Sequence, residues 1–352
     1  TSKLEIQGPS FYGEKGYKCI ITDVNDNVIE TDLVHYTLDG YKESDPYVQI
    51  GTRVLVPGKT LDLADTPFGT GKVTMSEKGD VLTLDNVNFQ NTVFDYDPFD
   101  ADIAFYFMCY QYLEDSFTLK LIGDNKINNT YFEEDARQGG ISFGFFFSGR
   151  GKQPEISVKG DGNLTIIGGS HAIYANTAIK IASDINMYCI ANHWNAGIHG
   201  KKITITNSSV IRATLTSYLF ESNNKEKGAD GTMTIEDNSI IQATIYPVQN
   251  SGRGSTLDAL SAVTTSHALN IKDSSIAIDL VYDYRNLELG DSLPPTTVIG
   301  SNNGDITITN SNISINAKSL NDEMSMVCYQ LDMISPQKDL VVNNSVIKAC
   351  AE

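Results

Sequence analysis

The sequence predicts an all-β protein, a right-handed parallel β-helix (solenoid) with an irregular N-terminal cap. One strand–turn–strand unit, clearest at residues 202–211, recurs down the chain. Its apolar and polar residues alternate, so that side chains two positions apart share one face of a strand. Asn207 and Ser208 follow, and Asn is among the few residues other than glycine that tolerate the left-handed backbone region of a sharp bend.

Copies of this unit begin at residues 82, 119, 156, 179, 203, 233, 269, 306 and 340. The intervals run from 23 residues (156 to 179) to 37 residues (82 to 119), which is typical of a solenoid with loops of variable length. A single unit would leave its apolar row exposed, whereas parallel stacking buries the rows as one core. A leucine-rich repeat would need an L-x-x-L-x-L frame and a helical segment, and neither pattern is found.

The first part of the chain does not show the repeat clearly. Short alternating segments at 18–22, 48–50 and 53–57 predict short strands. The end of a solenoid is an unpaired edge that needs covering. We therefore assign residues 1–75 to an N-terminal cap or small β region, and residues 76–352 to the parallel β-helix.

Charge and composition exclude several classes of protein. The chain has 352 residues, 41% of them hydrophobic, and 44 acidic against 26 basic residues give a net charge of −18. Such a surface repels nucleic acid and anionic membranes, and it could recruit Ca²⁺. No apolar run is long enough for a transmembrane helix, so we expect no membrane insertion.

The cysteines and the N-terminal residues do not determine whether the protein is intracellular or secreted. The five cysteines include no C-x-x-C pair and are odd in number, and Cys109, Cys189 and Cys328 lie in apolar segments, as small buried hydrophobes do. The first residues lack the profile of a signal peptide, which does not argue against secretion of a processed chain.

A resemblance adds to this interpretation. The segments 82–89, 119–127, 158–169 and 191–205, in that order, resemble the secreted surface β-helix proteins of Gram-positive and gut bacteria, often called carbohydrate-binding-domain proteins and similar in fold to pectate lyases. The resemblance covers about residues 80–220, and its motifs are structural. It implies an extracellular or cell-surface location and a polysaccharide or cell-surface glycan as partner.

Four aspartates are the candidate metal ligands. Asp95, Asp97, Asp100 and Asp102 fall within one short segment expected to be a loop. Carboxylates clustered in this way suit Ca²⁺, which takes oxygen ligands in flexible geometry. A solvated acidic loop on an acidic protein explains the same residues.

Trp194 is the candidate sugar-binding residue, with His193 and Asn195 beside it. An exposed indole flanked by polar side chains can stack on a sugar ring while its neighbours bond the hydroxyl groups. The alternative is a tryptophan packed over the edge of a coil. Among the histidines, His199 is expected to be an ordinary wall residue, and His171 and His267 stand alone in sequence.

The residues favour a non-catalytic polysaccharide-binding or adhesion protein. A Ca²⁺-dependent polysaccharide lyase is the second hypothesis, for which Arg150 and Arg253 are the only bases we would nominate. A structural surface spacer is the third. A basic residue held beside a Ca²⁺ site in a groove would favour the lyase, an exposed row of aromatic side chains without such a base would favour binding, and a featureless wall would favour the spacer.

Overall fold

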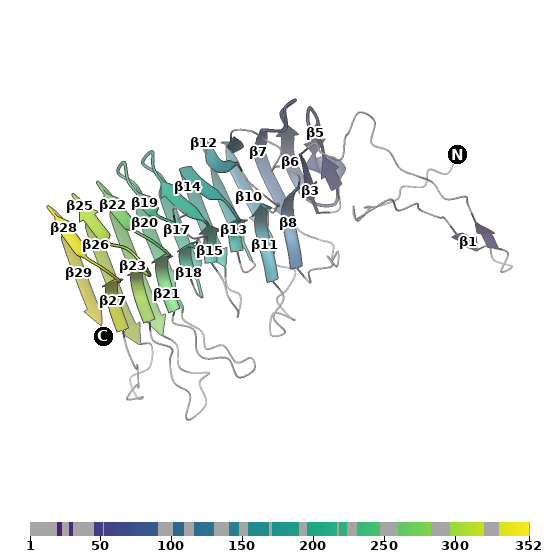
Figure 1. The fold of residues 1–352 in the computed structure, drawn as a ribbon. Coiled ribbons are helices and arrows are strands. Elements are labelled where there is room, and N and C mark those ends of the chain that lie inside the picture. The colour runs from purple at the N-terminus through teal and green to yellow at the C-terminus, as the bar shows by residue number, and fades with distance from the viewer. Residues whose placement is uncertain are drawn as a thin grey trace, which may run out of the picture.

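The computed structural model describes residues 20–22, 28–30, 46–51, 53–90, 101–108, 116–129, 141–147, 154–168, 171–189, 196–216, 218–223, 231–246, 260–282, 296–319 and 331–351. Its regular elements are β-strands, apart from a single 3₁₀ turn, η1 (Leu63–Asp65). Two large sheets run side by side along the molecule (Figure 1). A separate antiparallel pair consists of β1 (Ile20–Thr22) and β2 (Val28–Glu30).

The first of the two, which we call the long sheet, has seventeen strands. Its members are β5 (Thr60–Asp62), β6 (Gly69–Met75), β7 (Val81–Gln90), β9 (Ser116–Ile122), β10 (Asp124–Asn128), β12 (Glu155–Ile167), β14 (Ala178–Cys189), β16 (Lys202–Ile205), β17 (Val210–Leu215), β19 (Met233–Ile235), β20 (Ile240–Ile245), β22 (Leu269–Lys272), β23 (Ser275–Tyr282), β25 (Ile306–Thr309), β26 (Asn312–Ser319), β28 (Leu340–Asn343) and β29 (Val346–Ala351).

The second, which we call the short sheet, has ten strands. Its members are β3 (Tyr47–Ile50), β4 (Arg53–Leu55), β8 (Ala101–Met108), β11 (Ile141–Phe147), β13 (His171–Ala175), β15 (Ala196–Gly200), β18 (Tyr218–Ser222), β21 (Leu260–Thr265), β24 (Thr296–Ser301) and β27 (Leu331–Pro336).

The chain visits the two sheets in alternation, which produces a stack of coils. One coil, for example, consists of β15 in the short sheet followed by β16 and β17 in the long sheet, and β18 then returns to the short sheet beside β15. Each strand of this coil pairs in parallel with the corresponding strand of the next, as in β16 with β19 and β17 with β20. The prediction of an all-β fold with stacked parallel units is therefore confirmed.

Three strands of the long sheet, β7, β12 and β14, each join both parts of a coil in one continuous strand. β12 and β14 each span the length that β16 and β17 cover together in the following coil. The register of the pairing between β12 and β14 shifts between Lys159 and Asn163 of β12. Gly160 lies at this shift with φ +142°, and a Cβ there would come within 2.1 Å of the carbonyl oxygen of Leu121. The bend therefore requires glycine at this position.

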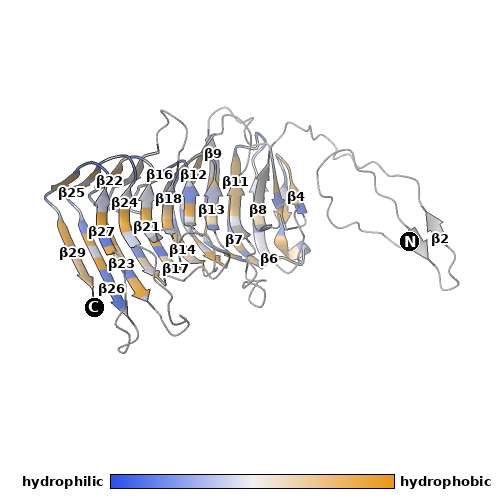
Figure 2. Cartoon of the chain, turned by 60° about the horizontal axis from the view of Figure 1, so that its bottom comes forward, coloured by the Kyte–Doolittle hydropathy of each residue, from blue (hydrophilic) through white to orange (hydrophobic). Residues whose placement is uncertain are grey.

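Apolar side chains at alternate strand positions point inward and form one core. In the first part of the long sheet, Ile203, Met233, Leu269 and Ile306 occupy one row, and each is fully buried. Along each strand, polar residues alternate with these buried residues, and Figure 2 shows the alternation as colour bands along the strands. Cys189 is a free, buried thiol, as its apolar surroundings in the sequence predict.

Bends with a left-handed residue separate the two parts of the long sheet. Asn207, Asp237, Asp273, Asn310 and Asn344 have φ between 45° and 61°. Their side chains bond from coil to coil: the amide Nδ2 of Asn344 donates to Oδ1 of Asn310 (2.8 Å), and that of Asn310 donates to Asp273 (3.0 Å). The polar residues that mark the repeat in sequence thus form a ladder along the stack.

The strands nearest the N-terminal end of the stack run differently. β3 pairs antiparallel with β4 and β8, and β6 pairs antiparallel with β5 and β7. Phe68, Phe89, Phe105 and Phe145 stack in sequence from this region into the parallel coils, with ring centroids 4.9–5.6 Å apart. The division at residue 75 into a cap and a β-helix stays a prediction.

In the part of the chain that the structure describes, no helix has the length and apolar character needed to span a membrane.

Candidate functional site

The residues nominated from the sequence lie mostly outside the described ranges. This holds for Trp194, His193 and Asn195, for Asp95, Asp97 and Asp100, and for Arg150 and Arg253. Asp102 was expected in a loop but is the second residue of β8, where its backbone is in register with Ser142 of β11. Within the described ranges no group of three or more His, Cys, Asp or Glu side chains could hold a metal ion. The sugar-binding and Ca²⁺ predictions therefore remain predictions.

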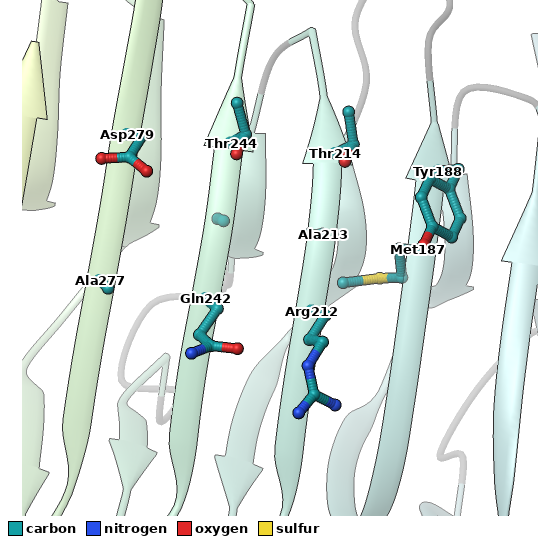
Figure 3. A pocket seen from close by; sticks show the side chains of 10 residues that line it. Met187, Tyr188, Arg212, Ala213, Thr214, Gln242, Thr244, Ala277 and Asp279 are labelled. Carbon is teal, nitrogen blue, oxygen red and sulfur yellow. The ribbon is translucent and has the colours of Figure 1, made fainter.

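The structure instead shows a shallow groove on the outer face of the long sheet (Figure 3). The groove has a volume of about 390 Å³ and crosses four neighbouring strands, β14, β17, β20 and β23. Its lining residues are Met187, Tyr188, Arg212, Ala213, Thr214, Gln242, Ala243, Thr244, Ala277 and Asp279.

In-register pairing explains the shape of the groove. The outward residues form two rows that run across the strands, one from Tyr188 through Thr214 and Thr244 to Asp279, the other from Arg212 through Gln242 to Ala277. Residues between the rows, such as Ala213 and Ala243, are buried, so that the backbone there forms the floor. The side chains of Thr214, Thr244 and Ala277 are small, so this part of the outer surface is recessed.

Tyr188 gives the groove an aromatic surface. The residue is 44% exposed, so its ring is accessible to a ligand. An exposed ring of this kind buries apolar area when a flat apolar group stacks on it, while its hydroxyl group can still form a hydrogen bond. The groove therefore has one position suited to the apolar face of a ring.

Hydrogen-bonding groups of both kinds surround that position. Arg212 and Gln242 are exposed and offer guanidinium and amide donors, and Thr214 and Thr244 offer hydroxyl groups. Asp279 accepts a hydrogen bond from Nδ2 of Asn316 (2.9 Å) on the next coil, which fixes its carboxylate. An aromatic ring among donors and acceptors in a concave surface is what a polar ligand with many hydroxyl groups requires.

A second group, of aromatic and polar residues, lies on the outer face of the short sheet. Phe146, Tyr174, His199 and Glu221 occupy one register row on four successive coils. The rings of Phe146 and Tyr174 stack with centroids 5.0 Å apart, and those of Tyr174 and His199 with centroids 4.6 Å apart and an interplanar angle of 5°. Nδ1 of His199 lies 2.8 Å from Oε2 of Glu221.

Further contacts fix this cluster. Nδ2 of Asn223 donates to the other carboxylate oxygen of Glu221 (3.1 Å), and the hydroxyl group of Tyr174 donates to Oδ1 of Asn176 (3.1 Å). The ring of His171 stands edge-on to Tyr174, with centroids 5.4 Å apart and an interplanar angle of 87°. The His199 and Glu221 side chains are 14% and 27% exposed, so solvent reaches both.

The environment sets the protonation state of each group. Burial and the neighbouring His199 lower the pKa of His171 to about 3, against a smaller opposite effect of Glu221. Burial alone would raise the pKa of Glu221, but the hydrogen bond and charge of His199 and the bond from Asn223 outweigh it and lower that pKa. Burial and the charge of Glu221 raise the pKa of Tyr174. At neutral pH, His171 is therefore uncharged, Tyr174 is a phenol and Glu221 is ionised.

Sequence reasoning missed both groups. His199 does lie on the wall, as expected, but it is bonded to Glu221, and His171 does not stand alone in space because its ring centroid is 6.3 Å from that of His199. Tyr188 and Arg212 look like any outward strand residues in sequence. Their outward position was readable from the alternation, but their neighbours on other coils were not.

No family model, no curated protein and no solved structure matches this chain. The fold and its surfaces therefore define the class: an all-β protein of stacked parallel coils, with a polar groove on one sheet and a histidine–glutamate pair on the other.

Proposed function

We propose that this protein is a right-handed parallel β-helix that binds a polysaccharide outside the cell or on a cell surface, and that the groove of the long sheet binds the sugar chain without acting on it chemically. The resemblance of residues 80–220 to surface β-helix proteins motivates the fold and the location. The observation that carries the binding role is the exposed ring of Tyr188 beside the polar groups of the groove.

Sugar chemistry matches this arrangement. A pyranose ring has an apolar face of C–H groups, which packs on an aromatic ring, and an edge of hydroxyl groups, each a donor and an acceptor. Arg212 and Gln242 are suited to the hydroxyl oxygens, and the Asp279 carboxylate accepts from hydroxyl hydrogens. The groove crosses four coils, so it has room for more than one sugar unit.

The aromatic stack on the short sheet is less suited to this role. Phe146, Tyr174 and His199 cover one another's faces, at interplanar angles of 12° and 5°. A sugar that stacks on a ring needs a free ring face, and in this row the inner faces are already packed. Tyr188 is therefore the better candidate.

Binding also explains the surface better than the other two hypotheses. A spacer needs no groove with an exposed tyrosine. A Ca²⁺-dependent lyase needs a metal site next to its base, and Arg212 has no group of three metal-ligating side chains near it among the described residues. The Ca²⁺ site predicted at Asp95, Asp97, Asp100 and Asp102 is a separate question.

The test is binding of a panel of soluble neutral and acidic polysaccharides by affinity electrophoresis, followed by calorimetry on the best ligand. We expect the Tyr188→Ala variant to bind about tenfold more weakly, which corresponds to about 1.4 kcal/mol. Tyr246→Ala is the matched control, because Tyr246 is 39% exposed, directly follows β20 of the same sheet and does not line the groove.

Arg212→Ala and Gln242→Ala should weaken binding as well. Trp194→Ala tests the sequence-based site in the same assay. Failure of every polysaccharide to bind, or equal losses in Tyr188→Ala and Tyr246→Ala, would refute the groove as the binding site.

A further inference from the structure

Two neighbouring apolar side chains lie on the outer face of the long sheet beside the groove. Val210 and Ile240 are the first residues of β17 and β20, and their backbones are in register. Both side chains point outward, because Ile211 and Ile241, which follow them, are buried in the core. Ile240 is 39% exposed. Val210 and Ile240, which we call the apolar pair, therefore give this face a small apolar patch.

Polar residues limit the apolar pair on both sides. Oδ1 of Asp184 on β14 accepts a hydrogen bond from the backbone N–H of Val210 (2.9 Å). On the other side, Ser275 of β23 is in register with Ile240. A long acyl chain or a protein partner needs a much larger apolar area than such a patch offers. The apolar pair is therefore suited to a group of about the size of a methyl.

Arg212 and Gln242 connect the apolar pair to the groove. They are the next outward residues of the same two strands, about 6.6 Å further along the backbone, and they are in register with each other. In Figure 3 both side chains extend toward the N-terminal ends of their strands, which is the side on which the apolar pair lies. A guanidinium group and a primary amide thus lie next to an apolar patch.

Together these side chains complement an acetamido group. Its methyl group needs an apolar contact, its carbonyl oxygen needs a hydrogen-bond donor, and its N–H needs an acceptor. The apolar pair supplies the contact, the guanidinium group of Arg212 donates, and the side-chain amide of Gln242 both donates and accepts. A hydroxyl group in the same place would leave the apolar pair in contact with water, and an acetyl ester would lack the N–H.

The distance to the aromatic ring of the groove separates two positions for sugar units. Tyr188 is in register with Thr214, which is the next outward residue of β17 after Arg212. The ring of Tyr188 and the apolar pair thus lie on different strands and in different rows of the sheet. A single sugar ring does not span them, so a chain of linked sugars is the ligand that reaches both.

We propose that the ligand of the groove is a polysaccharide of N-acetylated amino sugars. The apolar pair, Arg212 and Gln242 bind the acetamido group of one sugar unit, while the ring of another unit stacks on Tyr188. This inference rests on the proposed function, since it names the class of sugar that the same groove selects.

The experiment compares two oligosaccharides of equal length by calorimetry on the whole protein. N-acetylated chito-oligosaccharides and cello-oligosaccharides have the same ring and the same linkage, and differ only in whether one ring carbon carries an acetamido or a hydroxyl group. We expect the N-acetylated oligosaccharide to bind about tenfold more tightly, because burial of a methyl group and one additional hydrogen bond together have about this effect.

Ile240→Thr isolates the apolar contact. Threonine keeps the β-branched shape that suits a strand but offers less apolar surface, so the preference for the N-acetylated oligosaccharide should fall about fourfold. Ile122→Thr is the matched control, because Ile122 of β9 is also 39% exposed on the long sheet and does not line the groove. It should keep the preference. Gln242→Leu removes a donor and an acceptor at similar volume and should lower the preference as well.

The outcomes separate this inference from the proposed function. Equal affinity of the wild type for the two oligosaccharides, with weaker binding of both by Tyr188→Ala, would overturn the inference and leave the groove as a sugar-binding site. Binding of another polysaccharide but of neither oligosaccharide would have the same meaning. An unchanged preference in Ile240→Thr, shown to be folded by circular dichroism, would also overturn it. If no polysaccharide binds at all, the proposed function fails and this inference fails with it.

Discussion

His171 should make the protein less stable in acid, and one substitution isolates its effect. The folded protein holds the pKa of His171 near 3, against 6.5 for the same group in an unfolded chain. Below pH 6.5 the unfolded chain binds a proton that the folded protein does not accept. The free energy of unfolding therefore falls as the pH drops from about 6.5 toward 3.

The magnitude follows from the two pKa values. Between pH 8 and pH 5 the unfolded chain gains most of one proton at this site, which lowers the stability by at most about 2 kcal/mol at 1.36 kcal/mol per pH unit. The depressed pKa of Glu221 acts in the same direction at lower pH, since its contribution is lost as that carboxylate becomes protonated.

The assay is urea unfolding of the wild type and of His171→Phe at pH 8 and at pH 5. Phenylalanine keeps an aromatic edge against Tyr174 but does not titrate. We expect the wild type to lose up to about 2 kcal/mol more than the variant on acidification, and His267→Phe to behave as the wild type does. Equal pH dependence of the wild type and His171→Phe would show that the folded environment does not exclude the proton.

Two further predictions concern the ladder of turn residues and the aspartate segment. Asn310→Gly keeps the left-handed backbone but removes the side-chain bonds to Asp273 and Asn344, and we expect it to lower stability by about 1–2 kcal/mol; Asn310→Ala should lower it further because of its φ of 50°. If Asp95, Asp97, Asp100 and Asp102 bind Ca²⁺, the thermal midpoint should rise with Ca²⁺ relative to EDTA, and the variant with Asn at all four positions should lose that rise. An identical thermal midpoint in Ca²⁺ and in EDTA would contradict the Ca²⁺ site and favour the alternative interpretation of these aspartates, a solvated acidic loop.

The alternation and the turn residues were sufficient to predict the coils. The copies beginning at 203, 233, 269 and 306 coincide with β16, β19, β22 and β25, because burial of Ile and Leu at every second position is a local property of each strand. Asn and Asp in the bends show the left-handed φ that their residue type allows. Fusion of the two strand segments into β7, β12 and β14 was not expected, and in β12 it depends on the local bend at Gly160.

The sites were not predictable in the same way. Tyr188 and Asp279 line one groove, although they lie three coils apart along the chain. The pairing of His199 with Glu221 depends on which residue of β18 aligns with β15, and a shift of one residue would turn Glu221 to the other face. Sequence reasoning nominated Trp194 because a rare residue in a loop is conspicuous, whereas an outward tyrosine in a strand is not.

Because the strands pair in register, equivalent outward side chains also repeat at a regular distance along the stack. Residues of one row, such as Thr214 and Thr244, repeat at the strand spacing of about 4.8 Å along the stack. A ligand whose units repeat at a similar distance can make equivalent contacts on consecutive coils. A ligand with a different repeat distance loses these equivalent contacts after a few coils. The stack can thus select a ligand by its period as well as by its chemical groups.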